Sequence, residues 1–253
     1  MSENAYLKEV ENRILAALRQ EEYERLLPKM EKIFLEYHKP LFEPDQRIEY
    51  VYFPNSGVVS LLNVMENGES AEVGLVGYEG IVGLPVFLDA DSVSSLAIVQ
   101  IEGEGMRMKT EDFREEATRQ SPLHRLLLRY TQALLMQVSQ SAACNRFHSV
   151  EERFCRWILM SHDRVRKDTF SMTQEFLSKM LGVRRPTISV VAGMLQKADL
   201  IRYSRGKITI LDRKGLEAGS CECYKIVQKD FDRLIGGNVK PEVGQDQIGQ
   251  GGL

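Results

Sequence analysis

Long apolar runs are missing from this sequence of 253 residues. The longest, from Ile81 to Leu88, is far shorter than the roughly 20 residues that a membrane-spanning helix needs. The first residues are polar and lack the basic and then apolar build of a secretory signal peptide, so we expect no targeting segment. Cysteine is also scarce, with four unevenly spaced thiols at Cys144, Cys155, Cys221 and Cys223. This usage argues against a secreted disulfide scaffold and favours a reduced, cytoplasmic protein.

A global excess of basic residues is absent too, because the formal net charge is −3. The mean conceals a segregation of charge along the chain. Residues 1–149 hold 15 Lys and Arg against 23 Asp and Glu, a net of −8, whereas residues 150–215 hold 14 against 7, a net of +7. A compact positive segment beside an acidic one favours a polyanionic partner, although a solvated mixed-charge surface would give the same counts.

Short β-prone runs alternate with turn residues between residues 33 and 108. The runs are Ile48–Phe53, Val58–Asn63, Glu72–Val76, Leu96–Ile101 and Gly105–Met108. The dipeptide Asn67-Gly68 between two of them is typical of a hairpin turn. This spacing predicts an antiparallel sandwich or roll, preceded by short helices between residues 12 and 29.

A long helix is predicted to begin at Ser121-Pro122, with Ser as its cap and Pro in its first turn. An apolar stripe follows at Leu123, Leu127, Tyr130, Leu134 and Val138. A second apolar group lies beside it at Leu126, Leu128, Leu135 and Met136. Such a helix packs on the β-rich domain with one face and on a partner with the other. We assign the first stripe to a dimer seam; the alternative is a helix buried inside a monomer.

Residues 149–165 predict a further helix, and residues 172–210 carry the most informative pattern. A short helix over 173–181 ends at Gly182, which can adopt the left-handed conformation that turns the chain. A second helix over 184–198 has Pro186 in its first turn, where the missing N–H is tolerated. Two β-prone runs around Ser204-Arg205-Gly206 then form a hairpin with a basic tip. The order helix, turn, helix and hairpin predicts a winged helix-turn-helix.

The chemistry of that unit indicates contact with DNA. A recognition helix places its N-terminal residues on base edges in the major groove, where Arg donates two hydrogen bonds to guanine. Hydroxyl and basic side chains on the wing hold phosphates. The expected DNA-binding residues are Thr173, Arg184, Arg185, Pro186, Thr187, Ser189, Val190, Arg205 and Lys207. A solvated helix end is the alternative interpretation of Arg184 and Arg185.

Residues 10–235 resemble the Crp–Fnr family of bacterial transcription regulators. The resemblance is carried by Val51-Tyr-Phe-Pro54 with Gly57-Val-Val-Ser-Leu-Leu62, by Gly77-Tyr-Glu-Gly-Ile-Val-Gly83, and above all by the segment from Thr173 to Ser189. It implies an α+β protein with an N-terminal antiparallel β-roll of cyclic-nucleotide-binding type over 1–120. A dimerisation helix and hinge over 121–148, a winged helix-turn-helix over 149–235 and a disordered tail over 236–253 complete the expected domains.

The resemblance also implies partners and roles. The partners are double-stranded DNA with a near-palindromic site, a second copy of the chain and RNA polymerase. Arg185 matches the first base-reading position of the family, and Thr187 falls where the family touches phosphate. The family's best-known recognition helix continues with Glu and a later Arg, where this sequence has Pro186 and Val190. The family's usual half-site therefore does not carry over, and DNA shape is expected to contribute.

The β-roll departs from the nucleotide-binding members of the family. Those members hold a cyclic phosphate with a Gly-Glu pair and an Arg-Ser or Arg-Thr pair. The matching positions are Gly83 and Leu84 for the first pair, and Val93, Ser94 and Ser95 for the second. The carboxylate and the cation are both missing, and no Arg or Lys occurs between Arg47 and Arg107. We expect a degenerate pocket without cyclic-nucleotide binding, because a buried phosphate needs a compensating cation.

Other chemistries find little support. His38 and His124 are isolated, and Cys221 with Cys223 lacks a nearby histidine in the sequence, so we expect no metal, no cofactor and a structural role for both thiols. Cys144 and Cys155 leave redox sensing open. A phosphate loop, a two-histidine metal helix and a nucleophile elbow are missing, which argues against an enzyme. The remaining alternative is an interaction module that binds no DNA. Any effector, still unidentified, would act on the DNA-binding domain through the hinge at residues 147–149.

Overall fold

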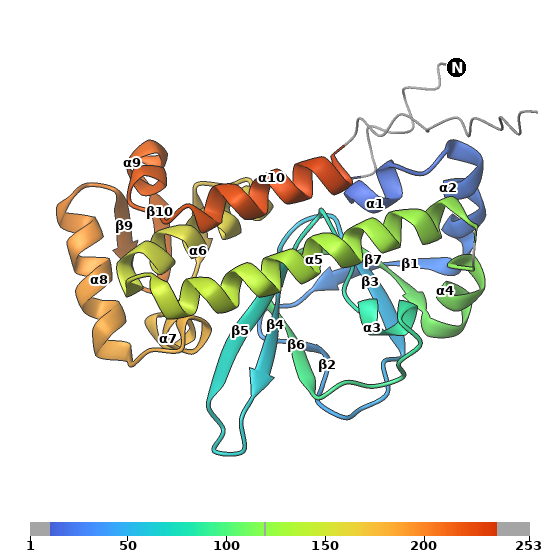
Figure 1. The fold of residues 1–253 in the computed structure, drawn as a ribbon, viewed down its shortest axis with the longest axis horizontal. Helices are drawn as coiled ribbons and strands as arrows, with labels where there is room; N and C mark the ends of the chain where they lie inside the picture. Colours follow the sequence, from blue (N-terminus) through green and yellow to red (C-terminus); the bar gives the residue numbers. More distant parts are fainter. Residues whose placement is uncertain (1–10, 119, 237–253) are drawn as a thin grey trace, which may run out of the picture.

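The computed structural model describes residues 11–118 and 120–236 (Figure 1). The described chain starts with α1 (Arg13–Ala16), α2 (Gln20–Leu26) and the 3₁₀ turn η2 (Leu27–Lys29). Seven strands follow: β1 (Met30–Leu35), β2 (Pro40–Phe42), β3 (Tyr50–Pro54), β4 (Val58–Val64), β5 (Ser70–Val76), β6 (Ser95–Ile101) and β7 (Gly103–Lys109). The five predicted β-prone runs correspond to β3 through β7, whereas β1 and β2 were not predicted. Beyond Gly236, the predicted tail lies outside the described residues.

These strands form two antiparallel sheets, which together make the β-roll. Their orders are β1-β7-β3 and β2-β6-β4-β5. The predicted hairpin at Asn67-Gly68 joins β4 to β5, and Gly68 has a φ of 82°, a conformation that glycine adopts without strain. Apolar side chains of both sheets, such as Phe53 and Val99, are buried between them. The predicted α+β architecture with an antiparallel N-terminal domain is confirmed.

Helices cover the roll and connect it to the rest of the chain. Short α3 (Leu84–Phe87) and α4 (Thr110–Glu116) belong to the roll, and α5 (Pro122–Phe147) crosses it (Figure 1). The Ser121 hydroxyl accepts a hydrogen bond from the His124 N–H at 3.0 Å, which is the predicted helix cap. A break at His148 separates α5 from α6 (Val150–Val165), which begins with a capping box between Ser149 and Glu152.

The C-terminal part begins with β8 (Thr169–Ser171), α7 (Gln174–Leu181) and α8 (Arg185–Lys197). It continues with β9 (Ile201–Ser204), β10 (Lys207–Ile210), α9 (Arg213–Ala218) and α10 (Cys223–Ile235). Helix α10 returns along α5 (Figure 1), and the rings of Phe231 and Tyr130 lie 6.4 Å apart. Within the described ranges, no helix has the length and apolar character required to cross a membrane.

The faces of α5 correct one detail of the predicted seam. Leu123, Leu127, Tyr130 and Leu134 are buried within the protomer, and only Val138 of that stripe is half-buried. The first four side chains are therefore not available to a second chain, and their assignment to the seam is wrong. Periodicity shows that two apolar faces exist, but it does not show which one meets the roll and α10.

Candidate nucleic-acid interface

Helix α7 is fixed by its own ends and its core contacts. The Thr173 hydroxyl accepts a hydrogen bond from the Phe176 N–H at 3.1 Å and so caps the helix. Phe176, Leu177 and Met180 are buried beneath it. Gly182 ends the helix with a φ of 60° and a ψ of 40°, the left-handed conformation that the sequence predicts.

Helix α8 presents its first turns to solvent. Arg184 is the cap residue and Pro186 lies in the first turn, while Ile188, Val191 and Leu195 bury the opposite face. The DNA-contact residues predicted on α8 are accessible to solvent. Thr187 is half-buried, and the others are exposed: Arg184, Arg185, Pro186, Ser189 and Val190. Val190 is 63% exposed, a large fraction for an apolar side chain without a partner.

One further contact and the helix dipole characterise this end of α8. The Ser189 hydroxyl donates to the Gln174 side-chain oxygen at 2.7 Å, which ties α8 to the start of α7. Helix α8 contains no acidic residue, so its positive N-terminal dipole adds to the charges of Arg184 and Arg185. A helix end of this kind favours phosphate oxygens or other anions.

The wing lies beside this helix. Strands β9 and β10 pair in register, and β8 adds a third strand in the order β8-β10-β9. Arg205 and Lys207 are exposed at the tip, next to Gly206, which has a φ of 72°. The Tyr203 hydroxyl donates to the Met172 carbonyl at 2.8 Å and anchors the wing, and burial raises the pKa of Tyr203 to about 12. The structure therefore brings the predicted residues of α8 and the wing together on one basic, exposed surface.

The segment from β8 to β10, which includes α7 and α8, is called the helix-turn-helix unit. This unit and the preceding helix α6 both pack against the β-roll. Helix α7 lies against β5, and the ring of Phe176 is 5.3 Å from that of His38 in the roll. The indole N–H of Trp157 in α6 donates to the Glu72 carboxylate of β5 at 2.9 Å. Ser60 donates to the other oxygen of the same carboxylate at 2.7 Å. Burial raises the pKa of Glu72 to about 7.

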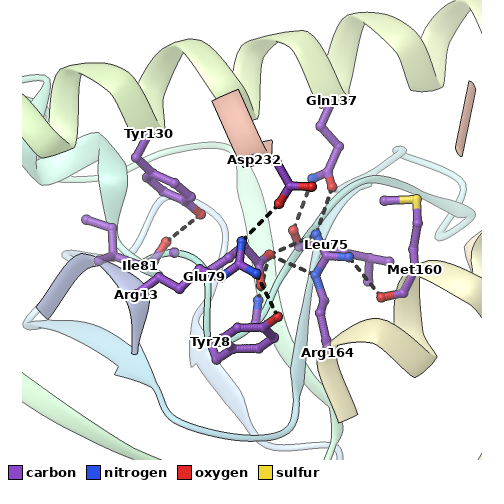
Figure 2. A network of polar contacts seen from close by, with 12 residues as sticks. Arg13, Leu75, Tyr78, Glu79, Ile81, Tyr130, Gln137, Met160, Arg164 and Asp232 are labelled. Atoms are coloured by element: carbon purple, nitrogen blue, oxygen red, sulfur yellow. Dashed lines mark hydrogen bonds and ion pairs between the residues drawn. The ribbon is translucent and has the colours of Figure 1, made fainter. Parts of the chain in front are cut away.

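A second polar network joins α6 to the roll and was not predicted from the sequence. Figure 2 shows Arg164 of α6 beside Glu79, with its Nη2 2.8 Å from the Glu79 Oε1. The same guanidinium donates to the Met160 carbonyl at 2.9 Å and to the Gln137 side chain at 3.2 Å. Gln137 in turn donates to the Leu75 carbonyl at 3.0 Å. Because both charges are almost fully buried, this network holds α5, α6 and the roll in one arrangement.

The predicted effector position has the character of a packed turn. Gly83, with a φ of 103°, precedes α3, and Leu84 is buried where a nucleotide-binding member has its carboxylate. Val93 and Ser95 are half-buried, and Ser94 is exposed. Arg107, the nearest following cation in the sequence, is paired with Glu31 on the outside of the roll.

The cysteines differ from expectation. Cys155 is fully buried, and burial raises the pKa of its thiol to about 12, which disfavours the reactive thiolate. The other three thiols converge with a histidine: Cys144, His148, Cys221 and Cys223 have their ligand atoms within 4.8 Å of one another. No histidine lies near Cys221 and Cys223 in the sequence, but the fold brings His148 beside them, so the sequence spacing alone was a wrong guide to their surroundings. Only the CxC spacing and the four-residue step from Cys144 to His148 hinted at this group.

Comparisons with known proteins agree with this description. Residues 152–218 match the Crp-like helix-turn-helix domain. FixK2 from Bradyrhizobium japonicum is 16% identical at a TM-score of 0.64, with 76% of this chain and 98% of that chain covered. A transcriptional regulator of the CRP family from Thermus thermophilus, TTHB099, is 16% identical at a TM-score of 0.63, covering 74% and 96%.

The c-di-GMP responsive global regulator CLP from Xanthomonas campestris is 17% identical at a TM-score of 0.57, covering 76% of this chain and 99% of that chain. No curated protein matches the sequence. The resemblance seen in the sequence is thus confirmed. The chain carries a Crp-like helix-turn-helix domain and has the fold of the Crp–Fnr transcription regulators.

Proposed function

We propose that the protein is a dimeric, sequence-specific transcription regulator that binds double-stranded DNA through α8 and the wing. The observation that carries this proposal is the exposed surface with Arg184 and Arg185 on the helix and Arg205 and Lys207 on the wing. The helix residues enter the major groove, and the wing and Thr187 hold phosphates. Its proposed partners are double-stranded DNA, a second copy of the chain and RNA polymerase. A protein with these partners acts in the cytoplasm and catalyses no reaction.

The dimer seam follows from the exposed face of α5. Leu128 and Leu135 are 51% and 58% exposed, and Ala142 is exposed one heptad further. Thr131 and Val138 are half-buried between them. The steps of three and four residues from Leu128 to Ala142 match the seam of a two-stranded coiled coil. This stripe replaces the buried one, and Val138 is common to both.

Pairing along α5 would relate two helix-turn-helix units by a two-fold axis. Recognition helices then meet half-sites about 34 Å apart, so the DNA site is a near-palindrome. Selection of bound DNA from a random pool tests this function. A pool without an enriched motif, or one enriched in a single half-site, would contradict it.

Binding by the Arg185→Ala variant tests the base contact. At fixed salt we expect a loss of about 1–3 kcal/mol in binding free energy and relaxed preference at one position of each half-site. Equal affinity and equal preference would show that Arg185 does not contact a base. Sedimentation of Leu135→Asp tests the seam, with Leu88→Asp on the roll, which is 56% exposed, as the matched control. Only the first variant should become monomeric at micromolar concentration.

We also propose that the roll has lost cyclic-nucleotide binding. The turn at Gly83 and Leu84 offers an apolar side chain in place of a carboxylate, and Ser94 has no neighbouring Arg in sequence. A cyclic nucleotide should leave the thermal midpoint unchanged, because only a ligand that binds the folded state raises it. A concentration-dependent rise would contradict this part of the proposal.

A further inference from the structure

Four side chains from distant parts of the sequence meet where α5 ends. Cys144 lies in the last turn of α5, and His148 follows that helix directly. Cys223 is the first residue of α10, and Cys221 lies two residues before it. The Sγ atoms of Cys144 and Cys221 are 3.5 Å apart, and the Cys223 Sγ is 3.5 Å from the His148 Nδ1. All four ligand atoms lie within 4.8 Å of one another.

These separations are close to those of a tetrahedral metal centre. With Zn–S bonds of about 2.3 Å and Zn–N bonds of about 2.05 Å, the edges of the tetrahedron are about 3.8 Å between sulfurs and about 3.6 Å between sulfur and nitrogen. The two contacts of 3.5 Å are slightly shorter than these edges, and the other pairs of ligand atoms are at most 4.8 Å apart, so an ion would need shifts of about 1 Å or less in the ligands. A set of three sulfurs and one nitrogen suits zinc among the common divalent ions.

We propose that Cys144, His148, Cys221 and Cys223 bind one zinc ion that fastens α10 to the end of α5. Cys144 and His148 are four residues apart, so the end of α5 directs both to the same side. Four protein ligands fill a tetrahedral site and leave no coordination position open, and three of them are buried while His148 is half-buried. The site is therefore a closed, structural one.

The surroundings supply the outer contacts that such a site needs. The His148 Nε2 lies 3.2 Å from the Glu222 carboxylate. A proton on Nε2 that is donated to Glu222 leaves the Nδ1 lone pair facing the thiols, the usual carboxylate–histidine–metal arrangement. The Gln140 side chain donates to the Cys223 Sγ at 3.0 Å. Three thiolates and one zinc ion carry a net charge of −1, and the buried guanidinium of Arg156 lies near Cys144 to offset it.

A disulfide between Cys144 and Cys221 is the competing chemistry, since their sulfurs are neighbours. It would require an oxidant and would leave the convergence of His148 and Cys223 without a function. Zinc uses all four groups in their reduced state and releases their thiol protons to solvent on binding. A zinc ion bound here would connect the hinge at residue 148 to α10, the last helix of the C-terminal domain.

Metal analysis of the full chain, purified under reducing conditions, tests the proposal. We expect one zinc per chain in the wild type and in Cys155→Ser, which changes a buried cysteine outside the cluster. Cys223→Ser and His148→Ala should lose the metal, whereas His148→Cys should retain it with four sulfur ligands. Far-UV circular dichroism verifies that each variant is folded. Wild-type protein without stoichiometric metal, or ligand variants that keep it, would overturn the proposal.

A cobalt titration gives an independent measurement. Chain stripped with a chelator should take up one Co(II) with the visible bands of a tetrahedral ion and a sulfur-to-metal charge-transfer band. Glu222→Ala should bind cobalt roughly 10- to 100-fold more weakly, because it removes the partner of His148. Octahedral spectra, or a Cys144–Cys221 disulfide found by peptide mapping of anaerobically purified protein, would refute the site. DNA selection does not depend on this result, so the two proposals fail separately.

Discussion

Breaking the buried ion pair between Glu79 and Arg164 should be among the most destabilising single changes in this protein. The side chains are 6% and 8% exposed, so neither charge is hydrated when its partner is removed. Removing one member of such a pair typically costs about 3–5 kcal/mol of unfolding free energy. The pair also joins α6 to the roll, so its loss would loosen the contact between α6 and the roll.

The surrounding hydrogen bonds determine which member matters more. In Glu79→Gln, Arg164 still donates to the Met160 carbonyl and to Gln137, so we expect the lower end, about 3 kcal/mol. In Arg164→Met, the carboxylate of Glu79 retains the Gly77 N–H at 3.1 Å, so we expect the upper end, about 5 kcal/mol. The double variant buries no charge and should cost no more than the worse single one.

Urea unfolding followed by the fluorescence of Trp157 measures these values. Trp157 is the only tryptophan and lies at the contact with the roll, so its emission reports on the affected region. All variants are compared at one protein concentration, because the proposed dimerisation would make the urea midpoint depend on it. Additive effects in the double variant, near 8 kcal/mol, would refute the argument that the two charges compensate each other.

Three further changes have definite outcomes. Glu72→Gln should flatten the pH dependence of the free energy of unfolding. The pKa of Glu72 is raised to about 7 in the folded state, so the wild-type side chain adds stability that is fully present below about pH 4.5 and is lost as the pH rises through 7. An unchanged pH profile of the urea midpoint would contradict this. Gly77→Ala should lower the thermal midpoint, because its Cβ would lie 2.7 Å from the Arg164 Cγ. Gly193→Ala has open space around its Cβ and should raise the free energy of unfolding by about 1 kcal/mol. The opposite order of the two variants would contradict the tight packing of Arg164 against Gly77. Arg205→Ala should weaken binding to all DNA sequences alike and reduce the salt dependence of log affinity by about one unit, and a change confined to one base position would make Arg205 a base contact instead.

The helix-turn-helix unit could be predicted from the sequence because its signals are local. The cap at Thr173, the turn at Gly182 and the proline at 186 each act within one helical turn, and each has the expected conformation. The β-prone runs likewise marked five strands. Strand β1 was missed because it depends on pairing with β7, more than 60 residues away.

Contacts between distant segments explain the remaining differences. The position of α10 on α5 decides which apolar stripe of α5 is buried, and no periodicity within α5 carries that information. The same applies to the cluster: 73 residues separate His148 from Cys221, and only the fold brings them together. The ion pair between Glu79 and Arg164 joins segments 85 residues apart, and each residue alone has the pattern of an ordinary surface charge.

The place of α10 on α5 has a consequence for synthesis on the ribosome. Helix α5 is complete at Phe147, but the residues that cover it around Tyr130 are made only with Phe231 and its neighbours. At 5–20 residues per second, that interval of 84 residues lasts roughly 4–17 s. During this time the nascent chain holds a long apolar helix with an uncovered side. A chain that stops before residue 223 would keep that side exposed permanently, which makes truncated products of this protein natural substrates for chaperones and proteases.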